Sequence, residues 1–338
     1  MMPAFTETYD QVLKRQVRLF QHANREFRFP SLLAERFEPT EVLAYGGFGV
    51  LLVACDRRVF QRRVLIKAGL LEPHLLSVPN NAALPRALDE NRRRAEHERK
   101  MLLHGQFRGA SGIPVLIDWF DDVNPLVRGP HRDPDGKTFT NDDPSLWGAA
   151  PYLVLSYIDG MELDEHCRTS RVTKNPLGAC RALGFYLSNT LDIFHLKEAF
   201  GPVELQFVYQ DLKPANILVS RSEGTYCLID FGSFAVIGPA GPSNAGVSTP
   251  GYAAPELQRL DIRSACRPRL DVYSLGVVLK ECLQRAFGNL QPVPNIPAVQ
   301  LQIPVSWQNF LDRCTAEDPD QRYQTMPEVI SALKKLES

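Results

Sequence analysis

The chain has 338 residues, of which 44% are hydrophobic and 23% are charged, so it can fill the core of one large domain or of two ordinary ones. Its formal net charge of -1 indicates no strongly basic or acidic domain, so we expect neither a nucleic-acid nor a membrane partner. No stretch approaches the roughly 18 apolar residues of a membrane span. The seven cysteines are scattered and form no Cys-x-x-Cys pair, which indicates reduced thiols in a cytoplasmic protein.

Residues 1–36 are expected to form an N-terminal leader. The apolar residues that recur in it at helical spacing are Val12, Leu13, Val17 and Phe20. This spacing predicts an amphipathic helix over residues 8–24 that ends before Pro30. The simplest interpretation is a helix packed on the main domain, and the alternative is a segment that docks a regulatory partner.

Strand and helix signals alternate in the next part of the chain. Aliphatic and β-branched residues with glycine punctuation predict three short strands over residues 38–68. A helix is expected over about 86–104, and two further strands are expected at 114–120 and 151–157. The polar stretch 124–147 between these strands predicts an exposed insertion.

Beyond residue 160 the pattern changes to long helical stretches. The segments with helical periodicity are 180–196, 271–287 and 305–318, and they are interrupted by two short strands near 216–219 and 227–230. The sequence therefore predicts an α+β fold. A small sheet-rich region over 37–158 precedes a larger, mainly helical region over 159–338.

Glycines cluster in the turn between the first two of these strands, in the segment Leu43-Ala-Tyr-Gly-Gly-Phe-Gly-Val50. Glycine lets a backbone approach a phosphate closely and present N–H groups to it. An ordinary hairpin turn is the alternative interpretation.

A lysine follows in the third strand. Lys67 ends the apolar run Val-Leu-Ile-Lys and needs an anionic partner if it points inward, whereas at a strand end it could also reach water. Glu98 on the following helix is a candidate partner. Glu96 competes with it, because this helix is rich in charge and either side chain could lie on a solvated face.

The most informative segments are VYQDLKPANIL and the later LIDFG. They place Asp211, Lys213, Asn216 and Asp230 among apolar residues. This set supplies a carboxylate that can accept a hydroxyl proton, a cation for a moving phosphate, and two oxygen ligands for Mg²⁺.

The order of these segments resembles the signature set of the protein kinases: a Gly-rich hairpin, a strand lysine, D-L-K-P-A-N and D-F-G. The resemblance continues through TPGYAAPE, DVYSLG and DPDQR, and it covers about residues 38–335. The chain is similar to a eukaryotic-type Ser/Thr protein kinase catalytic domain. This similarity implies a bilobal fold with a small antiparallel sheet lobe and a larger helical lobe, and it implies ATP and Mg²⁺ as cofactors, with Mn²⁺ as the alternative ion.

The resemblance also implies a nucleotide site. Its expected residues are Leu43, Gly46, Gly47, Phe48, Gly49, Leu51, Leu65, Lys67, Glu98, Leu155, Ser156, Ile158 and Leu218. Lys67 would contact the α- and β-phosphates and pair with Glu98. Leu155 would be the gatekeeper, and backbone groups of Ser156 and Ile158 would meet adenine.

For catalysis, the resemblance implies that Asp211 is the base and that Lys213 steadies the γ-phosphate. Asn216 and Asp230 would bind Mg²⁺. Lys213 together with Thr249 resembles serine/threonine kinases more than tyrosine kinases, so the expected substrate is a protein Ser or Thr hydroxyl.

Other matches are architectural. Glu256 and Arg322 match the family's structural ion pair, and Asp271 matches the residue that braces the catalytic loop through its backbone. His195 is interpreted as a packed core histidine. The link between His195 and Tyr209 is longer than is usual in the family.

Three departures from the family pattern bear on function. Ala44 replaces the first loop glycine, and Leu65 adds bulk at a position that packs on adenine. Tyr209-Gln210 replaces the usual His-Arg: the aromatic ring can still pack against Phe231, but Gln210 removes the guanidinium that pairs with a phosphorylated activation loop. We therefore predict activity without activation-loop phosphorylation.

Three functions remain open at this point. The first is an active Ser/Thr protein kinase, because every group that phosphoryl transfer needs is present. The second is a pseudokinase-like ATP-binding scaffold or allosteric partner without turnover, which the three departures favour. The third is a small-molecule kinase of related fold, against which the Ala254-Pro255-Glu256 segment and Arg322 favour a protein substrate.

Overall fold

The protein is described by a computed structural model. The residues described are 5–11, 13–23, 25–46, 49–70, 84–128, 131–132, 138–139, 149–169, 175–200, 202–244, 248–259, 267–288 and 303–337. The chain divides into two compact units, one of Met1–Leu102 with Pro114–Tyr157 and one of Leu103–Ile113 with Ile158–Ser338. Each unit has its own sheets and its own buried residues.

The main sheet of the first unit is antiparallel and five-stranded, in the order β4-β5-β6-β11-β7. Its strands are β4 (Phe37–Gly46), β5 (Gly49–Asp56), β6 (Arg62–Ala68), β7 (Leu116–Val123) and β11 (Ala149–Ser156). Helix α2 (Leu84–Phe107) follows β6 in the chain. The structure therefore confirms the three strands predicted over 38–68, the helix that follows them, and the two later strands.

The predicted leader helix is wrong, because this segment forms strands. A second sheet has the order β1-β2-β3-β8, with β1 (Phe5–Asp10), β2 (Arg15–His22), β3 (Arg25–Pro30) and β8 (Leu126–Arg128). Val17 and Phe20 are both buried, but residues three apart lie on one face of a helix and on opposite faces of a strand, so their spacing favours the helix that the structure does not contain. In β3, Phe27 and Phe29 lie two residues apart, which is the period of a strand.

The first three strands belong to the core of the first unit and do not form a separate segment. Phe20, Phe27 and Phe29 share one buried hydrophobic cluster with Phe37 and Val42 of β4. Part of the predicted insertion 124–147 extends this region, because β8 pairs with β3. Elsewhere in the insertion, β9 (His131–Arg132) pairs with β10 (Thr138–Phe139), and its other residues after Arg128 lie outside the described part of the chain.

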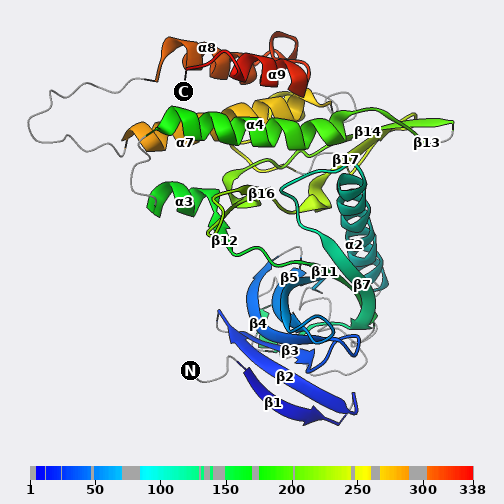
Figure 1. The fold of residues 1–338 in the computed structure, drawn as a ribbon. Coiled ribbons are helices and arrows are strands. Elements are labelled where there is room, and N and C mark those ends of the chain that lie inside the picture. The colour runs from blue at the N-terminus through cyan, green and yellow to red at the C-terminus, as the bar shows by residue number, and fades with distance from the viewer. Residues whose placement is uncertain are drawn as a thin grey trace, which may run out of the picture. The chain divides into compact units, whose positions relative to one another are not determined.

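Helices dominate the second unit, as predicted. They are α3 (Leu163–Thr169), α4 (Pro176–His195), α5 (Glu256–Arg259), α7 (Arg269–Gly288), α8 (Val305–Cys314) and α9 (Met326–Leu333). Helix α4 packs against α7 and α9, and α7 packs against α8 (Figure 1). Among the described residues, no helix combines the length and the apolar character needed to cross a bilayer.

Two small sheets accompany these helices. The predicted pair of strands is confirmed as β15 (Ile217–Ser220) and β16 (Tyr226–Leu228), joined by β12 (Gly160–Glu162). The sequence did not predict the other sheet, which has the order β13-β14-β17-β18. Its strands are β13 (Glu198–Phe200), β14 (Val203–Val208), β17 (Ala235–Gly238) and β18 (Gly241–Ser243).

Candidate functional site

In the first unit, β6 and α2 bring a lysine and a glutamate together. Lys67 Nζ lies 3.0 Å from Glu98 Oε1 and 2.8 Å from Glu98 Oε2. Glu98 is only 5% exposed, so the ion pair neutralises a buried carboxylate. Glu96, the competing candidate, pairs instead with Lys100 at 3.9 Å on an exposed part of the helix.

Lys67 lies on the sheet face opposite the hydrophobic cluster. Leu51, on β5, and Leu153, on β11, are its cross-strand partners, while Leu65 lies opposite Leu155. Because residues two apart on a strand share a face, the predicted contacts Leu51, Leu65 and Leu155 line the same face as Lys67. Leu51, Leu65 and Lys67 are only partly buried, so their side chains remain accessible to a ligand.

The predicted phosphate-binding hairpin joins β4 to β5. Gly46 pairs with Gly49, and the intervening Gly47 and Phe48 lie outside the described residues. A Cβ at Gly49 would lie 2.2 Å from the Ala68 carbonyl oxygen, and its φ of +134° is unfavourable for other residues. A Cβ at Gly46 would meet nothing within 4 Å. Packing therefore requires Gly49, whereas Gly46 leaves open space beside the turn.

Ser156 ends β11, where the adenine contacts are expected. Its N–H donates to the Val115 carbonyl at 2.8 Å, and its hydroxyl accepts from the Val115 N–H at 2.9 Å. The Ser156 carbonyl is then the backbone group of this residue that could meet a nucleotide. Leu43 is 43% exposed, and Ile158 is partly buried in the second unit.

In the second unit, three side chains of the predicted catalytic loop and the Thr249 hydroxyl form one hydrogen-bonded cluster. Asp211 Oδ2 accepts from Lys213 Nζ at 2.8 Å, and Asp211 Oδ1 accepts from Thr249 Oγ1 at 2.6 Å. Lys213 also donates to Thr249 Oγ1 at 2.8 Å. Asn216 Nδ2 donates to the Asp211 backbone carbonyl at 2.8 Å, which closes the loop around the 3₁₀ turn η2 (Pro214–Asn216).

Asp271, at the start of α7, accepts hydrogen bonds from the backbone of this loop. It is fully buried and accepts the backbone N–H groups of Tyr209 and Gln210, each at 2.8 Å. Its Oδ2 also lies 2.8 Å from His195 Nε2. The predicted bracing role of Asp271 is confirmed, and the buried His195 is part of the same support.

Tyr209 joins an aromatic cluster, as predicted for an aromatic at this position. Its ring lies edge-on to Phe231 at 6.3 Å and to Phe234 at 5.1 Å between centroids. Its hydroxyl donates to the Ile229 carbonyl. Burial, together with Asp230, Asp211 and Asp271 nearby, raises the pKa of Tyr209 well above its usual value, so the phenol stays protonated and keeps this bond.

Gln210 connects the catalytic loop to the segment after the D-F-G motif. Its Nε2 donates to the Ser233 carbonyl at 2.7 Å and to the Asn244 carbonyl at 2.9 Å. Asn244 in turn donates from Nδ2 to the carbonyls of Gly232 and Phe234, both at 2.9 Å. No sequence motif singles out Asn244, whose only signal is its place as an amide residue in a turn-forming Gly-Pro-Ser-Asn stretch.

The residues present fit a magnesium ion that is also held by phosphates. The amide nitrogen of Asn216 donates a hydrogen bond to the Asp211 carbonyl. The amide oxygen of Asn216 is therefore the atom that could bind a cation. Asp230 adds a carboxylate from a backbone position with φ of 62° and leads into the 3₁₀ turn η3 (Phe231–Ser233). No group of three His, Cys, Asp or Glu side chains in the described chain could hold a metal. Mg²⁺ commonly combines one or two protein ligands with phosphate and water oxygens.

The predicted structural ion pair is confirmed. Arg322 donates to both carboxylate oxygens of Glu256, from Nη1 at 2.7 Å and from Nη2 at 2.8 Å. Both residues are buried, and Arg322 Nε donates to the Ala316 carbonyl at 2.7 Å. The remaining predicted residue, Leu218, lies on β15 and is partly buried.

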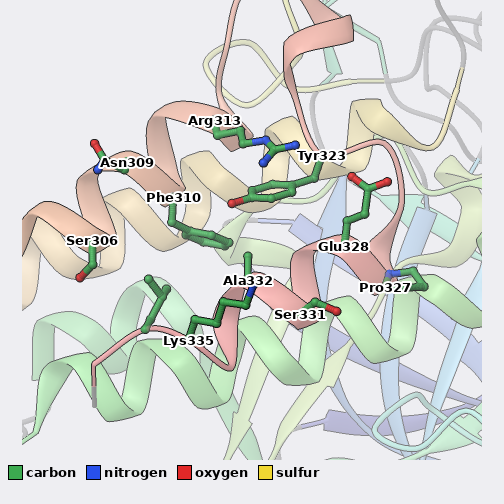
Figure 2. A pocket seen from close by; sticks show the side chains of 11 residues that line it. Ser306, Asn309, Phe310, Arg313, Tyr323, Pro327, Glu328, Ser331, Ala332 and Lys335 are labelled. Atoms are coloured by element: carbon green, nitrogen blue, oxygen red, sulfur yellow. The ribbon is translucent and has the colours of Figure 1, made fainter.

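A pocket of about 800 Å³ lies beside α8 and α9 (Figure 2). Phe310 and Tyr323 line it, and the Arg313 guanidinium lies 4.2 Å from the centre of the Tyr323 ring. It contains none of the residues that the sequence assigns to phosphoryl transfer. We therefore give it no part in the catalytic site.

Comparison with known proteins agrees with this geometry. The family model described as "Protein kinase domain" matches residues 140–332. The chain is 25% identical over 330 residues to "Serine/threonine-protein kinase PknB" of Mycobacterium tuberculosis (strain ATCC 25618 / H37Rv), covering 91% of this chain and 44% of that protein. It is 28% identical over 199 residues to "Serine/threonine-protein kinase PrkC" of Bacillus subtilis (strain 168), covering 54% of this chain and 28% of that protein.

A further relative is "Serine/threonine-protein kinase PknG" of Mycobacterium leprae (strain TN), which is 25% identical over 305 residues, covering 89% of this chain and 33% of that protein. The chain spans less than half the length of these relatives. Since the family model matches more than half of the chain, the chain belongs to the protein kinase domain family. The predicted α+β class and the resemblance to Ser/Thr kinases are confirmed.

Proposed function

We propose that this chain transfers the γ-phosphoryl group of ATP to a serine or threonine hydroxyl of a protein. The observation that carries the proposal is the cluster of Asp211, Lys213, Asn216 and Thr249. The Thr249 hydroxyl lies 2.6 Å from Asp211 Oδ1, within the distance at which a carboxylate can accept a hydroxyl proton. A substrate hydroxyl could therefore occupy a comparable position at this carboxylate.

The other groups have the roles that phosphoryl transfer requires. Lys67, oriented by Glu98, would bind the α- and β-phosphates, and Lys213 would bind the moving phosphoryl group. Asn216 and Asp230 would hold Mg²⁺, which neutralises charge on the phosphates. The partly exposed Leu51 and Leu65 would contact adenine. The cytoplasmic location expected from the reduced cysteines is part of the same proposal.

The acceptor is tested by incubating the purified chain with γ-labelled ATP, Mg²⁺ and a generic protein substrate. Acid hydrolysis of the product should release labelled phosphoserine or phosphothreonine. Labelled phosphotyrosine alone, or transfer only to an aminoglycoside or choline, would contradict the proposed acceptor. A chain whose melting temperature rises with Mg²⁺–ATP but that transfers no label would be the ATP-binding scaffold that Ala44 and Leu65 favour.

We also propose that activity does not depend on phosphorylation of the activation segment. The amides of Gln210 and Asn244 bind four backbone carbonyls in and around this segment, so neutral hydrogen bonds support its conformation without an arginine–phosphate pair. Phosphatase-treated chain, shown by intact mass to carry no phosphate, should have an initial rate close to that of the untreated chain. A rate that appears only after phosphate has been incorporated would refute this.

A further inference from the structure

Two cysteines from different helices face each other in the second unit. Cys167 of α3 and Cys282 of α7 place their sulfur atoms 3.9 Å apart. Both residues are partly exposed, so a small oxidant in solution can reach them. A disulfide needs the sulfur atoms to come to about 2.05 Å, an approach of about 2 Å that rotation of two unbranched side chains can provide.

An ion pair fixes the two helices in the register that brings these sulfurs together. Asp164 of α3 pairs with Arg285 of α7. Asp164 precedes Cys167 by three residues, and Arg285 follows Cys282 by three, so each charged residue lies on the same helix face as its cysteine. Arg285 is also paired with Glu281 within α7, which restricts its side chain further.

Cys167 is the more reactive member of the pair. The hydrogen bond with Cys282 lowers the pKa of Cys167, so more of it is present as the nucleophilic thiolate. Burial has the opposite effect elsewhere in this unit: it raises the pKa of Cys227 to about 12 and raises the pKa of Cys180 and Cys314 further. The same hydrogen bond with Cys167, together with burial, raises the pKa of Cys282 well above its usual value, so Cys282 reacts second, after Cys167 beside it has been oxidised.

We propose that hydrogen peroxide converts Cys167 and Cys282 into a reversible intramolecular disulfide that joins α3 to α7. The Cys167 thiolate attacks one peroxide oxygen, the O–O bond breaks, and sulfenic acid and hydroxide form. Cys282 sulfur then attacks the Cys167 sulfur, the S–O bond breaks, and the proton of Cys282 leaves with the hydroxyl group as water. In total, two thiols and one peroxide give one disulfide and two waters.

The bond would connect the two helices that contact the catalytic loop. Helix α3 packs against η2, the turn that contains Asn216, and α7 carries Asp271, which holds the backbone of the loop. A cross-link between positions this far apart in sequence restricts the unfolded chain strongly. We expect the melting temperature of the oxidised chain to rise by about 5–10 °C.

The test uses the reduced full chain treated with hydrogen peroxide and then digested without reductant. The expected result is an intact mass lower by about 2 Da, a peptide in which Cys167 is linked to Cys282, and recovery of both thiols with dithiothreitol. In Cys282→Ser the cross-link is lost, and dimedone labels Cys167 as a sulfenic acid. Cys55→Ser, which changes a partly exposed cysteine of the other unit, should leave the cross-link unchanged.

Three results would overturn the proposal: no loss of mass under peroxide, a cross-link to another cysteine such as Cys180 or Cys266, or a melting temperature that does not rise on oxidation. Because the readouts are mass, peptide identity and thermal stability, they do not depend on phosphoryl transfer. Failure of the proposed kinase activity would leave this inference standing, and the reverse also holds.

Discussion

Asp211 and Lys213 contact each other directly, at 2.8 Å, and both also contact one hydroxyl, that of Thr249. The hydroxyl donates to the carboxylate and accepts from the ammonium, so the two charged groups are held at a fixed separation. Charge-assisted hydrogen bonds of this kind are stronger than neutral ones. Thr249 therefore positions the two residues on which the proposed transfer depends.

The first prediction at the scale of one residue concerns Lys67. Lys67→Met should lower kcat/KM by about 100-fold or more, because it removes the cation that the proposal assigns to the phosphates and leaves Glu98 buried without it. Initial rates at several ATP concentrations measure the change. Lys100→Met is the matched control, since Lys100 is exposed and pairs only loosely with Glu96 at 3.9 Å. Equal rates for Lys67→Met and wild type would remove Lys67 from the mechanism.

At the scale of the element, the segment after the D-F-G motif depends on Gln210. Gln210→Leu should destabilise the chain by about 1–3 kcal/mol, because the buried Ser233 carbonyl and the partly buried Asn244 carbonyl lose their donor. Amide hydrogen exchange should become faster in residues 231–244. Gln284→Leu changes an exposed glutamine of α7 and should leave exchange there unchanged. Unaltered exchange in Gln210→Leu would show that other contacts order the segment.

The second prediction at this scale concerns the strands β1 to β3. Phe27 of β3 is fully buried in the cluster that it shares with β4, so Phe27→Ala should lower the free energy of unfolding by about 3–5 kcal/mol. Phe60 is fully exposed, and Phe60→Ala should leave stability unchanged. Urea denaturation compares the two variants. Similar midpoints for both would mean that the first three strands are not part of the core.

Asp56, at the end of β5, makes the stability of the fold depend on pH. Hydrogen bonds from Arg36 lower the pKa of the buried Asp56 below its ordinary value of about 3.9. A carboxylate with a lowered folded pKa stabilises the fold above that ordinary value and loses this contribution as pH falls through the folded pKa. Asp56→Asn should therefore cost about 1–3 kcal/mol near neutral pH and progressively less below pH ~4.

Urea unfolding of wild type and Asp56→Asn at a series of pH values measures this difference. Asp89→Asn serves as the control, because Asp89 forms only an exposed helical ion pair with Arg93. A difference between wild type and Asp56→Asn that stays constant down to pH 3 would contradict the assigned shift.

At the scale of the whole molecule, the sequence predicted the parts that depend on local patterns. The strands of 38–68, helix α2 and the catalytic loop follow from periodicity and from motifs read over a few residues. The strands β1 to β3 were missed because Val17 and Phe20 recur at helical spacing, although they lie on opposite faces of β2. Burial of Phe20 in the cluster that it shares with β4 is a tertiary contact that local spacing does not reveal. Pairing of β14 with β17 joins segments distant in sequence, which no local pattern reveals.

In the candidate site, too, local motifs predicted individual residues, whereas contacts between residues distant in the chain required the structure. The family resemblance implied Glu98 as the partner of Lys67, whereas the charge pattern of the helix alone left Glu96 as an alternative, and the distance to Lys67 agrees with Glu98. The Gln210–Asn244 contacts were hidden because Asn244 lies far from Gln210 in the chain and both residues adopt positive φ, of 70° and 55°. The α3–α7 cysteine contact depends on helix packing in the same way.

The most direct test of the central claim is the rate of phosphoryl transfer by Asp211→Asn. The substitution keeps the size of the side chain and removes the carboxylate that would accept the hydroxyl proton. We predict a fall in kcat of about 10²–10⁴-fold with Mg²⁺–ATP affinity retained, while Asp312→Asn, on the exposed side of α8, keeps the wild-type rate. Label transfer by Asp211→Asn at the wild-type rate would contradict the account.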